Sequence, residues 1–342
     1  MHIQRLFFSI LILSCFGCFC SCSSDDDNEI PKDKGLVSVD LDISFNMYMR
    51  PKKSADETVN RILILPFRKI DENLSDDDNN FEVAYSAAKQ IDINAFPTYI
   101  TKLILEENKS YQVLILGYKQ NDFDFSDQDN AGNIFRIGSS GTPVTLENFQ
   151  VSMPNIAETP ELFACISDAY LDEANKGNVF KPENISKLKG NLTRRVSRLT
   201  VGISEIPDYV SSISLEAEYI VTAFKPVIGD PVTVQSTDNN GNNILAEQSV
   251  GTSRVVKFSR FLFPTKDVYK TRLYINVLSG SSTTQYQIKV ADVSGASEAG
   301  YILFYPNNEI RITGRYDKLD SGMTINNTIG LDEDEWNGGV SE

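Results

Sequence analysis

The clearest fold pattern in the chain is Leu36-Val37-Ser38-Val39-Asp40-Leu41-Asp42-Ile43-Ser44-Phe45-Asn46-Met47. Apolar residues stand at every second position from Val37 to Met47, and Ser, Asp or Asn stands between them. Successive side chains of a β-strand point to opposite faces of a sheet, so this alternation predicts a half-buried strand. Pro51 follows closely and cannot donate to a β-ladder, which supports a break there.

Similar short apolar segments recur along the rest of the chain, separated by polar loops such as 71–80 and 121–133. Many short strands with regular turns predict an all-β sandwich or barrel. We expect two domains, residues 36–190 and 191–342, because the chain is longer than a single hydrophobic core usually supports. Further strands are expected at 59–67, 98–105, 111–118, 135–137, 195–204, 212–221, 232–235, 254–263, 272–278, 285–293 and 309–316.

The N-terminus has the pattern of an export signal. Arg5 precedes an apolar run from Leu6 to about Phe19, and cysteines and an acidic run follow. The run is shorter than the roughly 20 residues that a membrane-spanning helix needs. We interpret 1–21 as a lipoprotein signal peptide, Cys22 as the lipidated first residue and 22–35 as a tether. Cys15 and Cys18 are alternative lipidation sites, and a plain periplasmic signal is the alternative to a lipoprotein.

The composition after residue 21 excludes several kinds of chemistry. His2 is the only histidine, which excludes Ser-His-Asp and Cys-His catalysis and histidine-ligated metals from the mature chain. Cys165 is the only cysteine after Cys22, so no intramolecular disulfide is expected. The net charge of −15 disfavours nucleic acid as a partner. We expect no enzyme activity, no cofactor and no metal.

Three local patterns leave alternatives open. Thr159-Pro160-Glu161 is typical of a helix start and predicts a helix to about Asn175, although its surroundings are β. The loop 122–133 is rich in carboxylates that could hold calcium, but a solvated acidic loop explains it better. A glycan platform could form from aromatic side chains, which more often fill cores; the candidates are Tyr99, Tyr118, Phe123, Phe125 and Tyr170.

Taken in order, several segments resemble the fimbrillins, the subunit lipoproteins of type V fimbriae. They are the signal with Cys22, the alternating strand 37–47, the strand at 57–65, the segment Tyr111–Gly117 and the segment Thr193–Leu199 that opens the second half. The resemblance implies two tandem transthyretin-like Greek-key β-sandwich domains. It also implies a structural subunit of cell-surface fimbriae that supports adhesion, with shaft and membrane-anchor roles both open and a tip role third.

The resemblance further implies assembly by strand exchange. A protease would cut after a basic residue, removing the first strand, and a neighbour's C-terminal strand would fill the groove. Arg50 precedes Pro51, which blocks such cleavage, so Lys52, Lys53 and Arg61 are the remaining processing sites. None of these sites is the loop arginine expected of a shaft subunit. This difference favours an anchor or accessory subunit that keeps its lipid. The candidate donor strand lies in 323–331, with Ile325, Ile329, Leu331 and, outside it, Trp336.

The implied partners are other fimbrial subunits, the outer membrane through the N-terminal lipid, and host or bacterial surface ligands. The implied location is the surface of the outer membrane. The alternative function is that of a surface lipoprotein that binds glycans and does not polymerise.

Overall fold

The computed structural model describes residues 35–45, 59–93, 98–139, 141–156, 158–172, 174–236, 243–266, 270–288, 301–320 and 323–329. These ranges contain strands and short 3₁₀ helices and no α-helix, which confirms the all-β prediction. The 3₁₀ helices are η2 (Asp78–Asn80), η3 (Tyr85–Ala87), η4 (Phe125–Asp127), η5 (Pro182–Asn184) and η6 (Tyr316–Lys318). No helix in the described ranges is long and apolar enough to cross a membrane.

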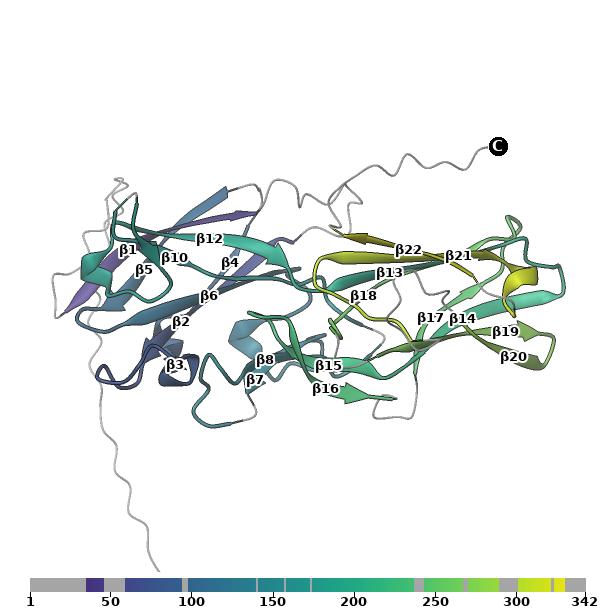
Figure 1. Ribbon diagram of the computed structural model, residues 1–342, viewed down its shortest axis with the longest axis horizontal. Coiled ribbons are helices and arrows are strands. Elements are labelled where there is room, and N and C mark those ends of the chain that lie inside the picture. Colours follow the sequence, from purple (N-terminus) through teal and green to yellow (C-terminus); the bar gives the residue numbers. More distant parts are fainter. Residues whose placement is uncertain are drawn as a thin grey trace, which may run out of the picture. The chain divides into compact units, whose positions relative to one another are not determined.

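The first half of the chain builds a 10-stranded sheet, with the order β11-β10-β12-β9-β6-β2-β3 and with β1, β4 and β5 joined to its sides (Figure 1). Its first strand, β1, pairs antiparallel with β5 and parallel with β12. The strands are β1 (Leu36–Phe45), β2 (Arg61–Lys69), β3 (Phe81–Val83), β4 (Lys89–Asp92), β5 (Thr98–Glu106), β6 (Tyr111–Tyr118), β9 (Phe163–Ile166), β10 (Asp168–Tyr170), β11 (Lys176–Gly177) and β12 (Lys187–Arg194).

The remaining strands form three four-stranded sheets. The first has the order β18 (Val256–Leu262), β13 (Ser197–Ser204), β21 (Asn308–Arg315) and β22 (Thr324–Ile329). The second has the order β17 (Ile244–Ser249), β14 (Val210–Glu218), β19 (Arg272–Ser279) and β20 (Ser282–Gln287). The third has the order β16 (Asp230–Gln235), β15 (Ile220–Lys225), β8 (Phe149–Ser152) and β7 (Arg136–Ser139).

Strand β2 explains why some of these strands are apolar throughout. Its residues Leu63, Leu65 and Phe67 belong to one buried cluster, whereas Ile62 and Ile64 belong to the other. Because alternate side chains point to opposite faces, β2 is buried on both faces and has no polar side to solvent. The same division holds for β6, whose 111–118 segment is buried at every position. These two strands lie between the two hydrophobic clusters, the larger of which continues into the second half of the chain.

The helix that the local pattern predicts at 159–175 is wrong. The segment instead forms β9 and β10, and Cys165 lies opposite Ile115 of β6 while Ala164 lies opposite Thr193 of β12. Ladder bonds to a strand on either side and burial of Leu162 through Cys165 outweigh the weak local preference for a helix.

The domain boundary expected at 190/191 falls inside β12. The chain leaves the first sheet between Arg194 and Ser197, where β12 ends and β13 begins. Strand β8 of the first half also pairs with β15 of the second half, Val151 lying opposite Phe224. The described residues from Gly35 onward cluster as one compact unit. The division of this unit into two domains at 190/191 stays a prediction.

Candidate functional site

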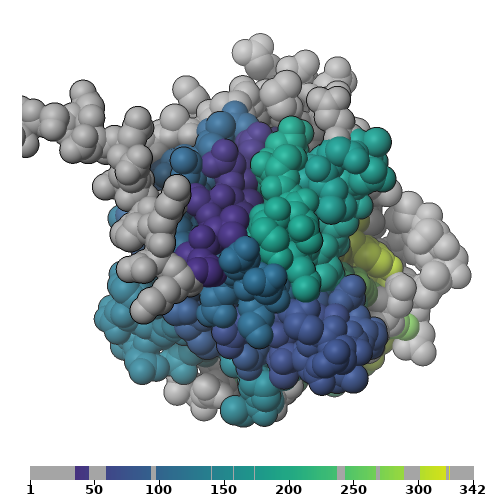
Figure 2. Space-filling view, turned by 90° about the vertical axis from the view of Figure 1, so that its left-hand side faces the viewer, coloured from purple at the N-terminus to yellow at the C-terminus, as the bar shows by residue number. Residues whose placement is uncertain are grey.

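Strand β1 lies in the interior of its sheet although it is the first strand in the described part of the chain. Its residues 36–44 pair with β5, and 41–45 pair with 188–192 of β12. Figure 2 shows β1 in purple at the surface beside β12 in teal. A strand with ladders on both sides leaves a gap one strand wide, bordered by two unpaired strand edges, when it is withdrawn.

The inward face of β1 contributes three side chains to the core. Val39 is 4% exposed, and Leu41 and Ile43 are 0% exposed. They belong to the cluster that also contains Leu103 and Leu105 of β5 and Leu188 and Leu192 of β12. Full burial of such a side chain contributes about 1.5–3 kcal/mol, so β1 is a substantial part of this cluster.

The outward face of β1 carries acidic residues beside lysines of both neighbouring strands. Asp40 is in register with Lys102 of β5, and Asp42 is in register with Lys189 of β12. Oδ1 of Asp42 is buried without a hydrogen-bond partner among the described residues. Opposite charges on adjacent strands stabilise their pairing by about 0.2–1 kcal/mol per pair. The two lysines therefore favour an acidic residue at both outward positions.

We call the space that β1 occupies between β5 and β12 the β1 site. A glycine of β12 borders it. Gly190 lies opposite Ile43 of β1, and its carbonyl oxygen accepts a hydrogen bond from Ser44 Oγ at 3.5 Å. A Cβ placed on Gly190 would collide with Cδ1 of Ile115 and lie 3.4 Å from Sγ of Cys165. A side chain at position 190 would therefore require the buried side chain of Ile115 to move.

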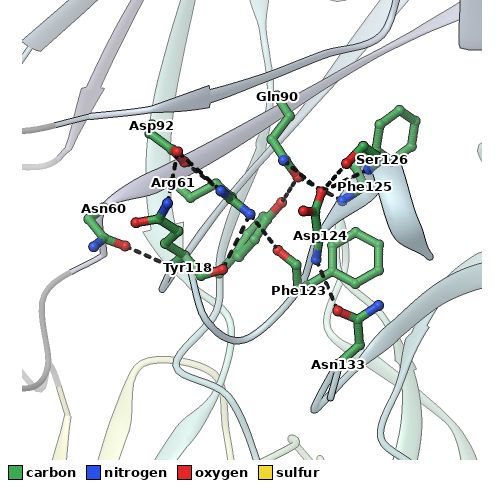
Figure 3. Close-up of polar contacts among 11 residues, drawn as sticks. Asn60, Arg61, Gln90, Asp92, Tyr118, Phe123, Asp124, Phe125, Ser126 and Asn133 are labelled. Carbon is green, nitrogen blue, oxygen red and sulfur yellow. Dashed lines mark hydrogen bonds and ion pairs between the residues drawn. The ribbon is translucent and has the colours of Figure 1, made fainter. Parts of the chain in front are cut away.

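Arg61, one of the predicted processing residues, lies at the start of β2 and is 7% exposed (Figure 3). Its Nε donates to Asp92 Oδ1 at 2.5 Å and its Nη2 donates to Asp92 Oδ2 at 3.1 Å. Its Nη1 donates to the carbonyl oxygens of Phe123 at 3.1 Å and Gln120 at 3.3 Å. These bonds join β2, β4 and the loop that follows β6. The peptide bond after Arg61 is consequently part of a hydrogen-bonded strand.

Gln90 connects this arrangement to the acidic loop. Its Oε1 accepts from Tyr118 Oη at 3.2 Å and from the Phe125 amide at 2.8 Å, and its Nε2 donates to Asp124 Oδ1 at 3.1 Å (Figure 3). Asp124 also caps η4 by accepting from the Ser126 amide at 2.9 Å. No sequence motif marks Gln90, so sequence reasoning missed it.

Charge in this network is compensated. The hydrogen bond from Arg61 lowers the pKa of Asp92, and the same bond raises the pKa of Arg61. Hydrogen bonds from Ser126 and Gln90 lower the pKa of Asp124. Burial raises the pKa of Tyr118. Each acidic group here is held ionised by a donor, which is the arrangement of a structural network rather than of an acid–base catalyst.

Several predicted site residues lie outside the described ranges: Cys22, Lys52, Lys53, Leu331 and Trp336. Ile325 and Ile329 lie in β22, which pairs antiparallel with β21 at the end of its sheet. Ile325 is in register with Ile312, and Ile329 is in register with Asn308. Ile325 and Ile329 therefore belong to a different sheet from β1.

The aromatic residues proposed as a glycan platform do not share one exposed surface. Tyr118 and Phe123 are buried, and both belong to the larger hydrophobic cluster. Phe125 stacks on Tyr85 at a ring separation of 6.4 Å. Lys187 and Lys189 lie over the ring of Tyr170 at 5.6 and 5.0 Å. The platform as a group of five is wrong, because core packing takes two of its members.

The acidic loop is organised by turns of its own. The side chain of Asn130 accepts from the Gly132 amide at 2.8 Å and donates to Asp127 Oδ2 at 3.0 Å. No group of three or more His, Cys, Asp or Glu side chains in the described ranges is placed to hold a metal ion. Asp122 is buried beside a cavity of about 270 Å³ whose lining also includes Lys119, Glu158, Glu161 and Arg260.

No protein-family model matches the chain, and no curated protein matches it. Solved structures that align with it include candidate adhesins and fimbrial proteins. A candidate cell adhesion protein of Bacteroides eggerthii aligns at 10% identity and a TM-score of 0.48, over 87% of this chain and 97% of that one. The fimbrial anchor protein Mfa2 of Porphyromonas gingivalis aligns at 12% identity and a TM-score of 0.41, over 85% and 97%.

The tip fimbrial protein Mfa3 of Porphyromonas gingivalis, truncated at its C-terminus, aligns at 13% identity and a TM-score of 0.39, over 86% of this chain and 99% of that one. The identities and TM-scores of these structures are too low to assign a role to any residue of this chain, so the functional argument depends on the geometry of β1.

Proposed function

We propose that this chain is a structural subunit of cell-surface fimbriae that assembles by strand exchange. As a shaft subunit it would accept a neighbour's strand in place of β1, and as an anchor it would keep β1 and take part through its own C-terminal donor strand. The subunit is exported as a lipoprotein through Cys22, is held at the outer membrane by that lipid, and has other fimbrial subunits as partners. It supports adhesion and carries no catalysis.

The observation that carries the proposal is the interior position of β1. The chain has to insert its first strand between β5 and β12, although a terminal strand can be placed at a sheet edge more simply. Withdrawing β1 exposes unpaired backbone groups on β5 and β12 and apolar side chains between them. An added strand satisfies both, because ladder bonds supply affinity and alternate side chains fill the vacated pockets.

Processing decides between the shaft and anchor roles. A chain that keeps β1 cannot accept a donor strand at this site, so it acts as an anchor at the membrane. A chain cut after Lys52 or Lys53 can lose β1 and join a shaft. Arg61 is the less suitable site because its guanidinium is paired with Asp92 and its backbone is in β2. The anchor role is favoured because Pro51 follows Arg50.

The test is mass spectrometry of the mature N-terminus on protein taken from the cell surface. An acylated Cys22 as the only start supports an anchor and contradicts the shaft role. A start at Lys53 or Ser54 supports loss of β1 and the shaft role. In parallel, deletion of residues 323–342 should abolish filaments if Ile325, Ile329, Leu331 and Trp336 form the donor strand. Filaments of normal length after this deletion would contradict the donor assignment.

A further inference from the structure

We propose that the β1 site selects a donor strand from a different protein and rejects the C-terminal strand of this chain, an inference that rests on the proposed function. The preferred donor has apolar side chains at three alternate positions and acidic side chains at the two positions between them. The chain therefore takes part in a junction between unlike subunits at this site.

The apolar requirement follows from the three inward positions of β1. Val39, Leu41 and Ile43 are at most 4% exposed and are surrounded by the leucines of β5 and β12. A polar side chain placed there loses its water and finds apolar neighbours. An amide buried without a hydrogen-bond partner costs about 1–3 kcal/mol, so each inward position discriminates against Asn, Gln or a charged residue.

The acidic requirement follows from the lysines on either side of the strand. Lys102 of β5 is in register with Asp40, and Lys189 of β12 is in register with Asp42. Lys102 and Lys189 are both exposed at the outer face. A donor with lysine or arginine at these two positions would place like charges side by side, which is destabilising.

The C-terminal segment 323–331 meets neither requirement. Its sequence is Met323-Thr324-Ile325-Asn326-Asn327-Thr328-Ile329-Gly330-Leu331. With Ile325 at the Val39 position, Asn327 falls at the fully buried Leu41 position. With Ile329 at the Leu41 position, Asn327 falls at the Val39 position. A further shift by two residues puts Glu333 at the buried Ile43 position. No frame places an acidic residue at both outward positions while filling all three inward positions with apolar side chains.

The experiment uses the full mature chain, residues 22–342, with a specific protease site inserted between Lys53 and Ser54. Cutting leaves β1 seated but no longer covalently joined to β2. A maleimide dye on Cys22 labels the released fragment, since burial raises the pKa of Cys165 to about 12 and keeps that thiol unreactive. Displacement of the labelled fragment is then measured against peptide concentration.

Four peptides are compared: residues 36–45, the same peptide with Asp40→Lys and Asp42→Lys, residues 323–331, and residues 323–331 with Asn327→Val, Thr328→Asp and Gly330→Asp. The 36–45 peptide should displace the fragment, and the 323–331 peptide should need at least a tenfold higher concentration. The three substitutions should recover most of that difference. The lysine peptide should be weaker than its parent, and added salt should reduce this gap.

Equal displacement by the 36–45 and 323–331 peptides would overturn the inference while leaving strand exchange intact. Displacement by none of the peptides, including 36–45 itself, would overturn strand exchange and hence the proposed function. Displacement by the lysine peptide at the same concentration as by its parent would confine the selection to the inward positions and overturn the acidic requirement.

Discussion

Arg194 and Glu161 form an ion pair that is almost completely withdrawn from solvent: Arg194 Nη2 lies 2.8 Å from Glu161 Oε1, and the two side chains are 4% and 2% exposed. The guanidinium also lies 4.9 Å from the ring of Phe163, and its Nη1 donates to Asn307 Oδ1 at 3.3 Å. Arg194 is the last residue of β12. The pair therefore fixes the point at which the chain leaves the first sheet.

Removing one member of this pair should be costly. Glu161→Leu leaves the guanidinium of Arg194 buried without its carboxylate, and we expect the free energy of unfolding to fall by about 3–5 kcal/mol. The double variant Glu161→Leu with Arg194→Met should recover much of this loss. Urea unfolding measures both, with Glu147→Ala as the control, since the side chain of Glu147 is 55% exposed and that of Glu161 only 2%. A single variant within 1 kcal/mol of the parent would contradict the structural role of the pair.

The stability of the protein should depend on pH through Asp122. Burial raises the pKa of its carboxyl group from 3.8 to about 6, against the opposing effect of Lys119. Between pH 4 and 6 the folded state therefore holds the proton that the unfolded chain releases, so stability falls as the pH rises through this window and levels off above it.

We expect Asp122→Asn to abolish this part of the pH dependence and to raise the free energy of unfolding at pH 7.5 by about 1–2 kcal/mol. Asp129→Asn is the control, because Asp129 is exposed in the same loop. Unfolding measured from pH 4 to 8 gives both quantities. An unchanged slope between pH 4 and 6 in the Asp122→Asn variant would show that another group titrates there.

The two faces of β1 should respond differently to substitution. Leu41→Ala removes a side chain that is 0% exposed, and we expect a loss of about 2–5 kcal/mol in the free energy of unfolding. Ser38→Ala, on the exposed face of the same strand, should change it by less than about 0.5 kcal/mol. Thermal or urea unfolding of the uncut chain makes the comparison. Similar losses in both variants would contradict the assigned register.

Gly190 should not tolerate a side chain. Gly190→Ala forces Ile115 or β12 to move, and we expect a loss of about 1–3 kcal/mol. Gly138→Ala provides the control, since no atom lies within 4 Å of the Cβ it would add. If Gly190→Ala is as stable as Gly138→Ala, β12 and β6 are farther apart than described.

Trypsin should spare the bond between Arg61 and Ile62 in the folded protein, because Arg61 is held by Asp92 and lies in β2. The same bond should be cut after unfolding in urea, which serves as the control. Peptide mass mapping at short digestion times makes the measurement. Early cleavage after Arg61 would restore it as a processing site.

The sequence predicts β1 well because this strand is buried on one face only. Apolar and polar residues therefore alternate at every position from Val37 to Phe45. The helix prediction for 159–175 fails because it depends on residues close together in the sequence. The strand partners of this segment, Ile115 and Thr193, lie far away in the chain. The same limit hides the Arg61 network. Asp92 and Gln90 are ordinary polar residues until β4 is placed beside β2.

Strand β1 also determines how the molecule can bear load. Its ladders with β5 and β12 run along the strand, so a force applied along its axis acts on all of their hydrogen bonds at once instead of opening them one by one. From β12 the backbone continues within three residues into β13, through the anchored side chain of Arg194. Tension on whatever strand fills this site is thus transmitted in shear, directly through the central strands of the subunit, and bypasses its surface loops.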